Sequence, residues 1–173
     1  MADVQPTMVT GLFRDRDSAE RAYQSASARG YSSSDVNIAM SDDTRKKYFA
    51  GPATTELGNK AAEGAGVGGA IGGTIGAIAA AIAAVGTSLV IPGLGLVIAG
   101  PAAAAIAGAG AGAAAGGILG ALVGWGIPEE RVKHYEKGIK EGGILMGIKP
   151  KSDDDARRLA EEWKTHKGEH IYP

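Results

Sequence analysis

Hydrophobic positions near the N-terminus recur first with the spacing of a strand and then with that of a helix. Residues 7–13 (TMVTGLF) are rich in strand-forming residues, and 35–40 (DVNIAM) alternate as a half-buried strand does. Asp17, with Glu20 three residues later, predicts a capping box that starts a helix between these strands, and Gly30 is expected to end it. Residues 1–50 therefore predict a strand–helix–strand unit, whose helix has the apolar face Ala19, Ala22, Tyr23 and Ala26.

The C-terminal residues repeat this pattern. Residues 143–149 (GILMGIK) and 169–173 (EHIYP) predict strands, and Ser152, with Asp155 at the capping-box position, predicts the start of a helix between them. Its apolar face is Ala156, Leu159, Ala160 and Trp163. Neither half can bury its sheet face alone, so we expect one α+β fold, a ferredoxin-like βαβ-βαβ sandwich interrupted between its second and third strands. Two unrelated halves are the alternative. In the sandwich the strands at 35–40 and 143–149 are neighbours, so the insert is expected to leave and return at nearly the same place.

The residues between the two halves have a different composition. From Gly64 to Pro128 there is no Asp, Glu, Lys, Arg, His, Asn or Gln, and 39 of these 65 residues are Gly or Ala. Glycine recurs at every fourth position in two runs, which predicts small-residue stripes on two helices at about 59–86 and 100–126. We expect residues 51–127 to form an antiparallel glycine-zipper hairpin, with 128–173 supplying a connector helix and the second half of the sandwich. The expected helix-packing residues are Gly64, Gly68, Gly72, Gly76, Gly108, Gly112, Gly116, Gly120 and Gly124.

Residues 87–100, between the predicted helices, are the most apolar of the chain, and Pro92-Gly93 interrupts the helical pattern there. We expect them to be the hairpin tip and to insert into a membrane, through Leu89, Val90, Ile91, Pro92, Leu94, Leu96 and Val97. Each predicted helix is about 40 Å long, against about 30 Å for the hydrocarbon core. Trp125, at the base of the second helix, is expected at the membrane interface. The alternative is a soluble homo-oligomer that buries its hairpins internally, with room for a small apolar ligand.

Charged connectors flank the insert. Arg45, Lys46 and Lys47 form a small basic cluster, read either as a solvated turn capped by Ser41 or as a contact with anionic lipid head groups. After the insert, Pro128 is expected to start a helix at its first position. The apolar side of that helix is Val132, Tyr135 and Ile139.

Two segments, VIPGLGLVIAGP (90–101) and GIPEERVKHYEKGIKEGG (126–143), resemble a bacterial family of general stress proteins with a central glycine-zipper hairpin. Members are described as heat-induced or low-temperature-induced proteins. The resemblance covers nearly the whole chain, including the opening strand with GLF. It implies a stress-linked protein of the membrane or assembly type, and it carries over no catalytic residue.

Composition excludes several function classes. The net charge is −1 and the pI about 6.3, so no nucleic-acid surface is expected, and the absence of Cys excludes thiolate chemistry. His166 and His170 are four apart, but Gly168 is expected to separate a helix from a strand between them, and Asp153–Asp155 fall in a first helical turn. We therefore expect no enzyme, no cofactor and no metal site.

The expected partners and location follow from the insert. Further copies of the chain and a lipid membrane are the expected partners, with the polar sandwich in the cytoplasm because the first residues do not have the pattern of a cleaved signal. A soluble cytoplasmic assembly is the alternative. A ligand-sensing regulatory domain is a weaker one, based on fold analogy alone.

Overall fold

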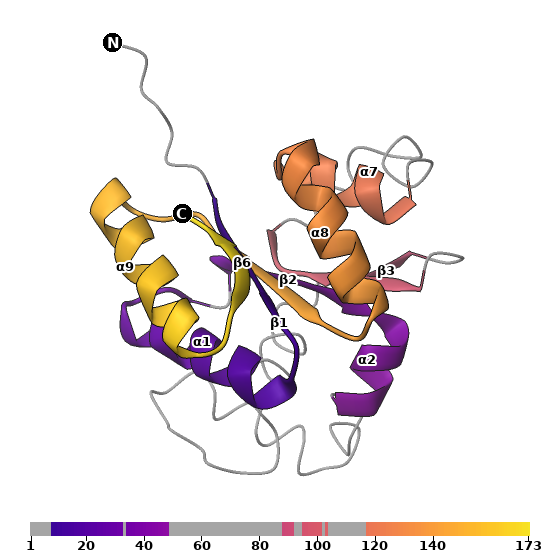
Figure 1. Cartoon of the computed structure of the whole chain (residues 1–173), viewed down its shortest axis with the longest axis horizontal. Coiled ribbons are helices and arrows are strands. Elements are labelled where there is room, and N and C mark those ends of the chain that lie inside the picture. The colour runs from indigo at the N-terminus through magenta and orange to yellow at the C-terminus, as the bar shows by residue number, and fades with distance from the viewer. Residues whose placement is uncertain (1–7, 33, 49–87, 92–94, 102, 104–116) are drawn as a thin grey trace.

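The computed structural model of the protein describes residues 8–32, 34–48, 88–91, 95–101, 103 and 117–173 (Figure 1). These residues form one antiparallel six-stranded sheet, in the order β3-β4-β2-β5-β1-β6, and five helices. The predicted α+β class is confirmed. The strands are β1 (Val9–Phe13), β2 (Val36–Ser41), β3 (Ser88–Ile91), β4 (Leu96–Ala99), β5 (Ile144–Ile148) and β6 (Glu169–Tyr172). The helices are α1 (Arg16–Ala28), α2 (Asp42–Tyr48), α7 (Gly117–Gly124), α8 (Glu129–Lys140) and α9 (Asp153–Thr165).

The two ends of the chain share this sheet. β5 lies between β1 and β2 and is antiparallel to both, with Ile148 opposite Val9 on one side and Val36 on the other. β6 pairs with the far side of β1. The expected neighbour relation between 35–40 and 143–149 is therefore confirmed.

Helices cover both faces of the sheet. α1 and α9 lie on one face, and α7 and α8 lie on the other (Figure 1). Successive strand residues alternate between the two cores, as Ile144 belongs to the core under α1 and α9 while Leu145 belongs to the core under α7 and α8. The prediction that β2 is half-buried is wrong, since its first five residues are all buried, because α8 covers the face that alternation assigned to solvent.

Helix starts agree with the sequence in part. Ser152 and Ser41 cap α9 and α2 as predicted, accepting from the backbone N–H of Asp155 and Thr44, each at 3.1 Å. The predicted Asp17 cap is wrong: Asp15 is the N-cap of α1 and accepts from the Ser18 N–H at 2.8 Å. Pro128 is likewise the N-cap of α8 and not its first helical residue.

Within the apolar segment 87–100, the described residues 88–91 and 96–99 are strands of the sheet and not the tip of a helical hairpin. β3 and β4 form an antiparallel pair, and β4 pairs with β2, with Leu96 opposite Ser41 and Ala99 opposite Ile38. A short β-branched run bounded by Gly and Pro also fits a buried strand, and the edge of β2 offers unpaired backbone groups that such a run satisfies. The insert therefore contributes two strands to the sheet. The first predicted helix (59–86) lies outside the described residues, whereas α7 falls within the second.

Candidate functional site

The glycine row of α7 faces away from the sheet. Gly120 is partly exposed and Gly124 is exposed, whereas Ile118, Ala121 and Leu122 of the same helix are buried in the core with β4. Val123 lies beside the glycines with 43% of its surface exposed and is, outside β3, the one large hydrophobic residue so exposed in the described part of the chain. These two zipper glycines are thus not used to pack α7 on the sheet. The other predicted packing glycines lie outside the described residues: Gly64, Gly68, Gly72, Gly76, Gly108, Gly112 and Gly116.

The predicted tip residues are part of the sheet. Leu96 and Val97 in β4 are 0% and 1% exposed and enter the two different cores. Their expected exposure to lipid is therefore wrong, because helices cover both faces of the strand. Leu89, Val90 and Ile91 form β3, and Pro92 and Leu94 lie outside the described residues.

Trp125 is a core residue. Only 6% of its surface is exposed, and it belongs to the core between the sheet and α7 and α8. A Cβ placed on Gly147 of β5 would lie 3.0 Å from Trp125 Cζ2, so the missing side chain of Gly147 makes room for the indole. The predicted interfacial position is therefore wrong.

The basic cluster is paired within its own helix. Arg45 Nη2 and Lys46 Nζ lie 2.9 and 2.6 Å from the Asp42 carboxylate, and Lys47 Nζ lies 5.0 Å from the centre of the Tyr48 ring. The hydrogen bonds from Lys46 and then Arg45 lower the pKa of Asp42. The structure brings the three basic residues together on α2, where their contacts are those of a solvated helix. The contact with lipid head groups stays a prediction.

Histidines and acidic residues form no metal centre in the described residues. His170 stacks on His134, with ring centroids 4.7 Å apart, and parallel stacked rings do not direct their nitrogens at one point. No group of three or more potential ligands gathers in the described ranges. Among the same residues, no helix combines the length and the apolar character needed to cross a membrane.

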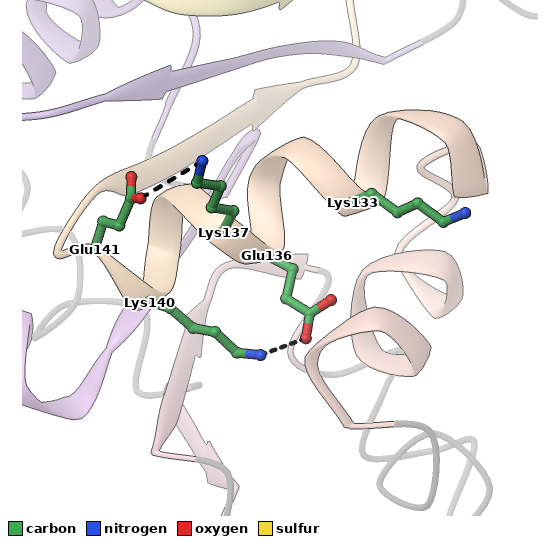
Figure 2. A pocket seen from close by; sticks show the side chains of 5 residues that line it. All are labelled: Lys133, Glu136, Lys137, Lys140 and Glu141. Carbon is green, nitrogen blue, oxygen red and sulfur yellow. Dashed lines mark hydrogen bonds and ion pairs between the residues drawn. The ribbon is translucent and has the colours of Figure 1, made fainter.

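A shallow depression lies on the outer side of α8 (Figure 2). Its two carboxylates already have partners, since Glu136 accepts from Lys140 at 2.7 Å and Glu141 lies 4.0 Å from Lys137. The remaining lining residue, Lys133, points away from these pairs (Figure 2). Four of the five side chains come from α8 and the fifth, Glu141, from its C-cap, so this place is a solvated charged surface with no arrangement for catalysis.

A polar cluster missed by the sequence reasoning joins the two halves of the chain. Tyr31 donates to Asp155 on α9 and accepts from the backbone N–H of Lys151 at 3.0 Å. Arg29, at the end of α1, pairs with Glu162 and lies 3.6 Å from Asp155. These partners are more than 100 residues apart in the chain, so no local pattern predicts them.

Deprotonation of Tyr31 is expected to lower the stability of the protein at high pH. Burial and then the hydrogen bond with Asp155 raise the pKa of Tyr31 from 10.0 to about 12. A raised pKa stabilises the fold fully below pH 10 and loses that contribution as pH rises through about 12. The free energy of unfolding, measured with urea, should therefore fall more between pH 10 and 12 for the wild type than for Tyr31→Phe. Parallel curves for the two proteins would contradict this assignment.

Tyr135 connects α8 to both β1 and β6. Its buried hydroxyl lies 2.7 Å from Thr10 Oγ1 and donates to the His170 carbonyl at 2.6 Å, and burial raises the pKa of Tyr135. Tyr135→Phe leaves the buried Thr10 hydroxyl without this partner, so we expect a loss of about 1–2 kcal/mol in unfolding free energy, measured by urea denaturation. Tyr172→Phe, at a partly exposed ring, is the control and should change stability by less than about 0.5 kcal/mol. Equal stability of wild type and Tyr135→Phe would contradict the role of this hydroxyl.

What remains as a candidate site is a group of three elements without charge at one end of the sheet, beside the charged helix α2, which packs against β4. β3, β4 and α7 contain no Asp, Glu, Lys, Arg or His, and β4 and α7 share one core. In Figure 1 β3 and α7 lie on the right, as does α2. We call β3, β4 and α7 the uncharged end. No protein-family model, curated protein or solved structure matches the chain.

Proposed function

We propose that the protein is a non-enzymatic assembly protein, which associates with further copies of itself through the uncharged segment 64–128. The observation that carries this proposal is the outward-facing row of Gly120 and Gly124 beside the exposed Val123. Each glycine inside a helix costs about 0.8–1 kcal/mol relative to alanine. Glycines that face water offset none of this free-energy cost, whereas glycines packed against another helix allow the two backbones to approach closely.

Chain length favours self-association over a hairpin that spans the bilayer. The uncharged residues preceding β3, 64–87, number 24, and those between β4 and α7, 100–116, number 17. A helical hairpin that crosses the hydrocarbon core and returns needs about 40 residues. Because both segments are joined to the sheet at β3, β4 or α7, neither is long enough to cross and come back.

Association with one leaflet of a membrane is the second candidate function. The uncharged composition of the same segment favours it, since these residues would meet no charge penalty among acyl chains. Lys47 and its neighbours on α2 would then face anionic head groups. With either candidate function, we propose that the charged part of the protein lies in the cytoplasm.

We propose further that β1, α1, β2, β5, α9 and β6 form a ferredoxin-like unit. The support is the antiparallel order β2-β5-β1-β6, with α1 and α9 together on one face. The elements α2, β3, β4, α7 and α8 are then an insertion between its second and third strands. A role in stress is part of this proposal and rests on the resemblance of segments 90–101 and 126–143 to general stress proteins.

A size series at two glycines tests the assembly. Gly120→Leu with Gly124→Leu should abolish association, because two isobutyl groups hold the partner helix away, whereas Gly120→Ala with Gly124→Ala should preserve it. The measurement is the mass of the full-length protein in detergent-free buffer by light scattering, with the predicted pair Gly112→Leu and Gly116→Leu as a second variant. Retained mass in the leucine variants contradicts the glycine row, and a monomeric wild type contradicts self-assembly. Retention of the protein in an alkaline-extracted membrane pellet would favour the second candidate.

A further inference from the structure

The two edges of the sheet differ in how they meet solvent. β6 forms one edge and carries the exposed residues Glu169 and His170. Its backbone is irregular, with φ +48° at His170 and a register shift against β1 between Thr10 and Leu12. Charge, twist and irregular register are the features by which proteins prevent their edge strands from pairing with other chains.

β3 forms the other edge and has none of these features. Its four residues, Ser88–Ile91, contain no charge and no proline. They pair with β4 in continuous register, from Ser88 opposite Ala99 to Ile91 opposite Leu96. Within the described residues β3 pairs on this one side, so alternate N–H and C=O groups point outward along a regular edge.

We propose that two copies of the chain pair antiparallel through β3 about a two-fold axis, which joins two six-stranded sheets into one. This inference rests on the proposed self-association and names its contact. The added ladder satisfies the outward backbone groups of both edges at once, in the manner of strand addition. A two-fold contact is self-complementary, so one strand type is sufficient.

Charge favours a second copy as the occupant. Close to a two-fold axis each residue lies near its own counterpart, so a charged residue there meets like charge. The uncharged end (β3, β4 and α7) has no such residue, whereas the β6 edge would place Glu169 close to its own counterpart. The residues of β3, β4 and α7 themselves offer no ion pair to an acidic or basic partner.

Spin labels at the two edges test the pairing in the full-length protein. The chain contains no Cys, so Ser88→Cys and His170→Cys each provide a single attachment point. With strands about 4.8 Å apart and about 3.4 Å rise per residue, paired β3 strands place two labels at position 88 within about 20 Å. The same sheet places two labels at position 170, on the far edges, about 50 Å apart. Dipolar electron spin resonance measures both distances.

Short distances at position 88 together with long ones at 170 support the proposal. Long distances at position 88 in a protein that still associates overturn the edge pairing and leave the proposed self-assembly intact. A monomeric protein overturns both. As a second variant, Ser88→Lys should weaken association by about tenfold or more through like charge at the axis, with unchanged thermal unfolding. His170→Lys, at the other edge, should leave association unchanged, and equal weakening by both variants also overturns the pairing.

Discussion

Replacing Gly100 by alanine is expected to destabilise the protein far more than the same change at Gly95 in the same pair of strands. Gly100 follows β4 with φ +101°, and a Cβ there would overlap the Val36 carbonyl oxygen and lie 3.0 Å from Asn37 Cα. Val36 and Asn37 are the first two residues of β2, and these atoms belong to its backbone. The overlap can therefore be relieved only if β4 separates from β2. We expect a loss of about 3 kcal/mol or more, from left-handed backbone strain together with the overlap.

Gly95 is the matched control. Its φ is +59°, and nothing lies within 4 Å of the position of an added Cβ. Only the backbone strain applies, so Gly95→Ala should lose about 1 kcal/mol. Urea unfolding of the two variants gives the comparison. Equal small losses in the two variants would contradict the placement of β4 against β2. They would favour the prediction that residues 87–100 form the tip of a helical hairpin.

Trp125→Ala is the second change with a large expected effect. The indole is 6% exposed and fills the core between the sheet and α7 and α8, so its removal leaves a large cavity. We expect a loss of about 3–5 kcal/mol in unfolding free energy, measured by denaturant unfolding in the absence of lipid. Trp125→Phe should lose less, since a smaller aromatic ring still fills part of the space and the buried indole N–H, which has no hydrogen-bond partner among the described residues, is removed.

Val123→Ala is the control for Trp125. Val123 lies two residues away and is 43% exposed, so at protein concentrations too low for association its truncation should change the stability by less than about 0.5 kcal/mol. An interfacial Trp125 would give the opposite outcome. Its removal would then lower membrane partition and leave unfolding unchanged, which contradicts the core position.

The buried faces of the helices were predictable because the 3.6-residue spacing of apolar residues defines such a face within a few turns. The faces built on Ala19 and Ala156 are both buried as expected, and so is the Val132 face of α8. The helix starts were less certain in the sequence. Asp15 and Asp17 are each followed three residues later by a residue that suits a cap, Ser18 and Glu20. The end of β1 decides between them, since the strand continues to Phe13 and the helix begins at Arg16.

Apolar residues were recognised, but not the surroundings that bury them. The run LVIA in β4 and the indole of Trp125 have the same hydrophobicity whether a sheet or a lipid surrounds them. The choice depends on the open edge of β2 and on the space above Gly147, which are distant in sequence. The pairing of Arg29 with Glu162 depends on the same long-range approach.

The sequence by itself determined the two strand–helix–strand ends and the absence of charge from 64–128, and it left open whether the two ends share one sheet. These follow from residue spacing and composition, which act over a few residues. Only the tertiary structure decided that 88–91 and 96–99 extend the sheet, that α7 and α8 cover its second face, and that Gly120 and Gly124 face outward. The physical reason is that hydrophobicity requires burial without specifying a partner, and the partner is chosen by unpaired strand edges and by shape.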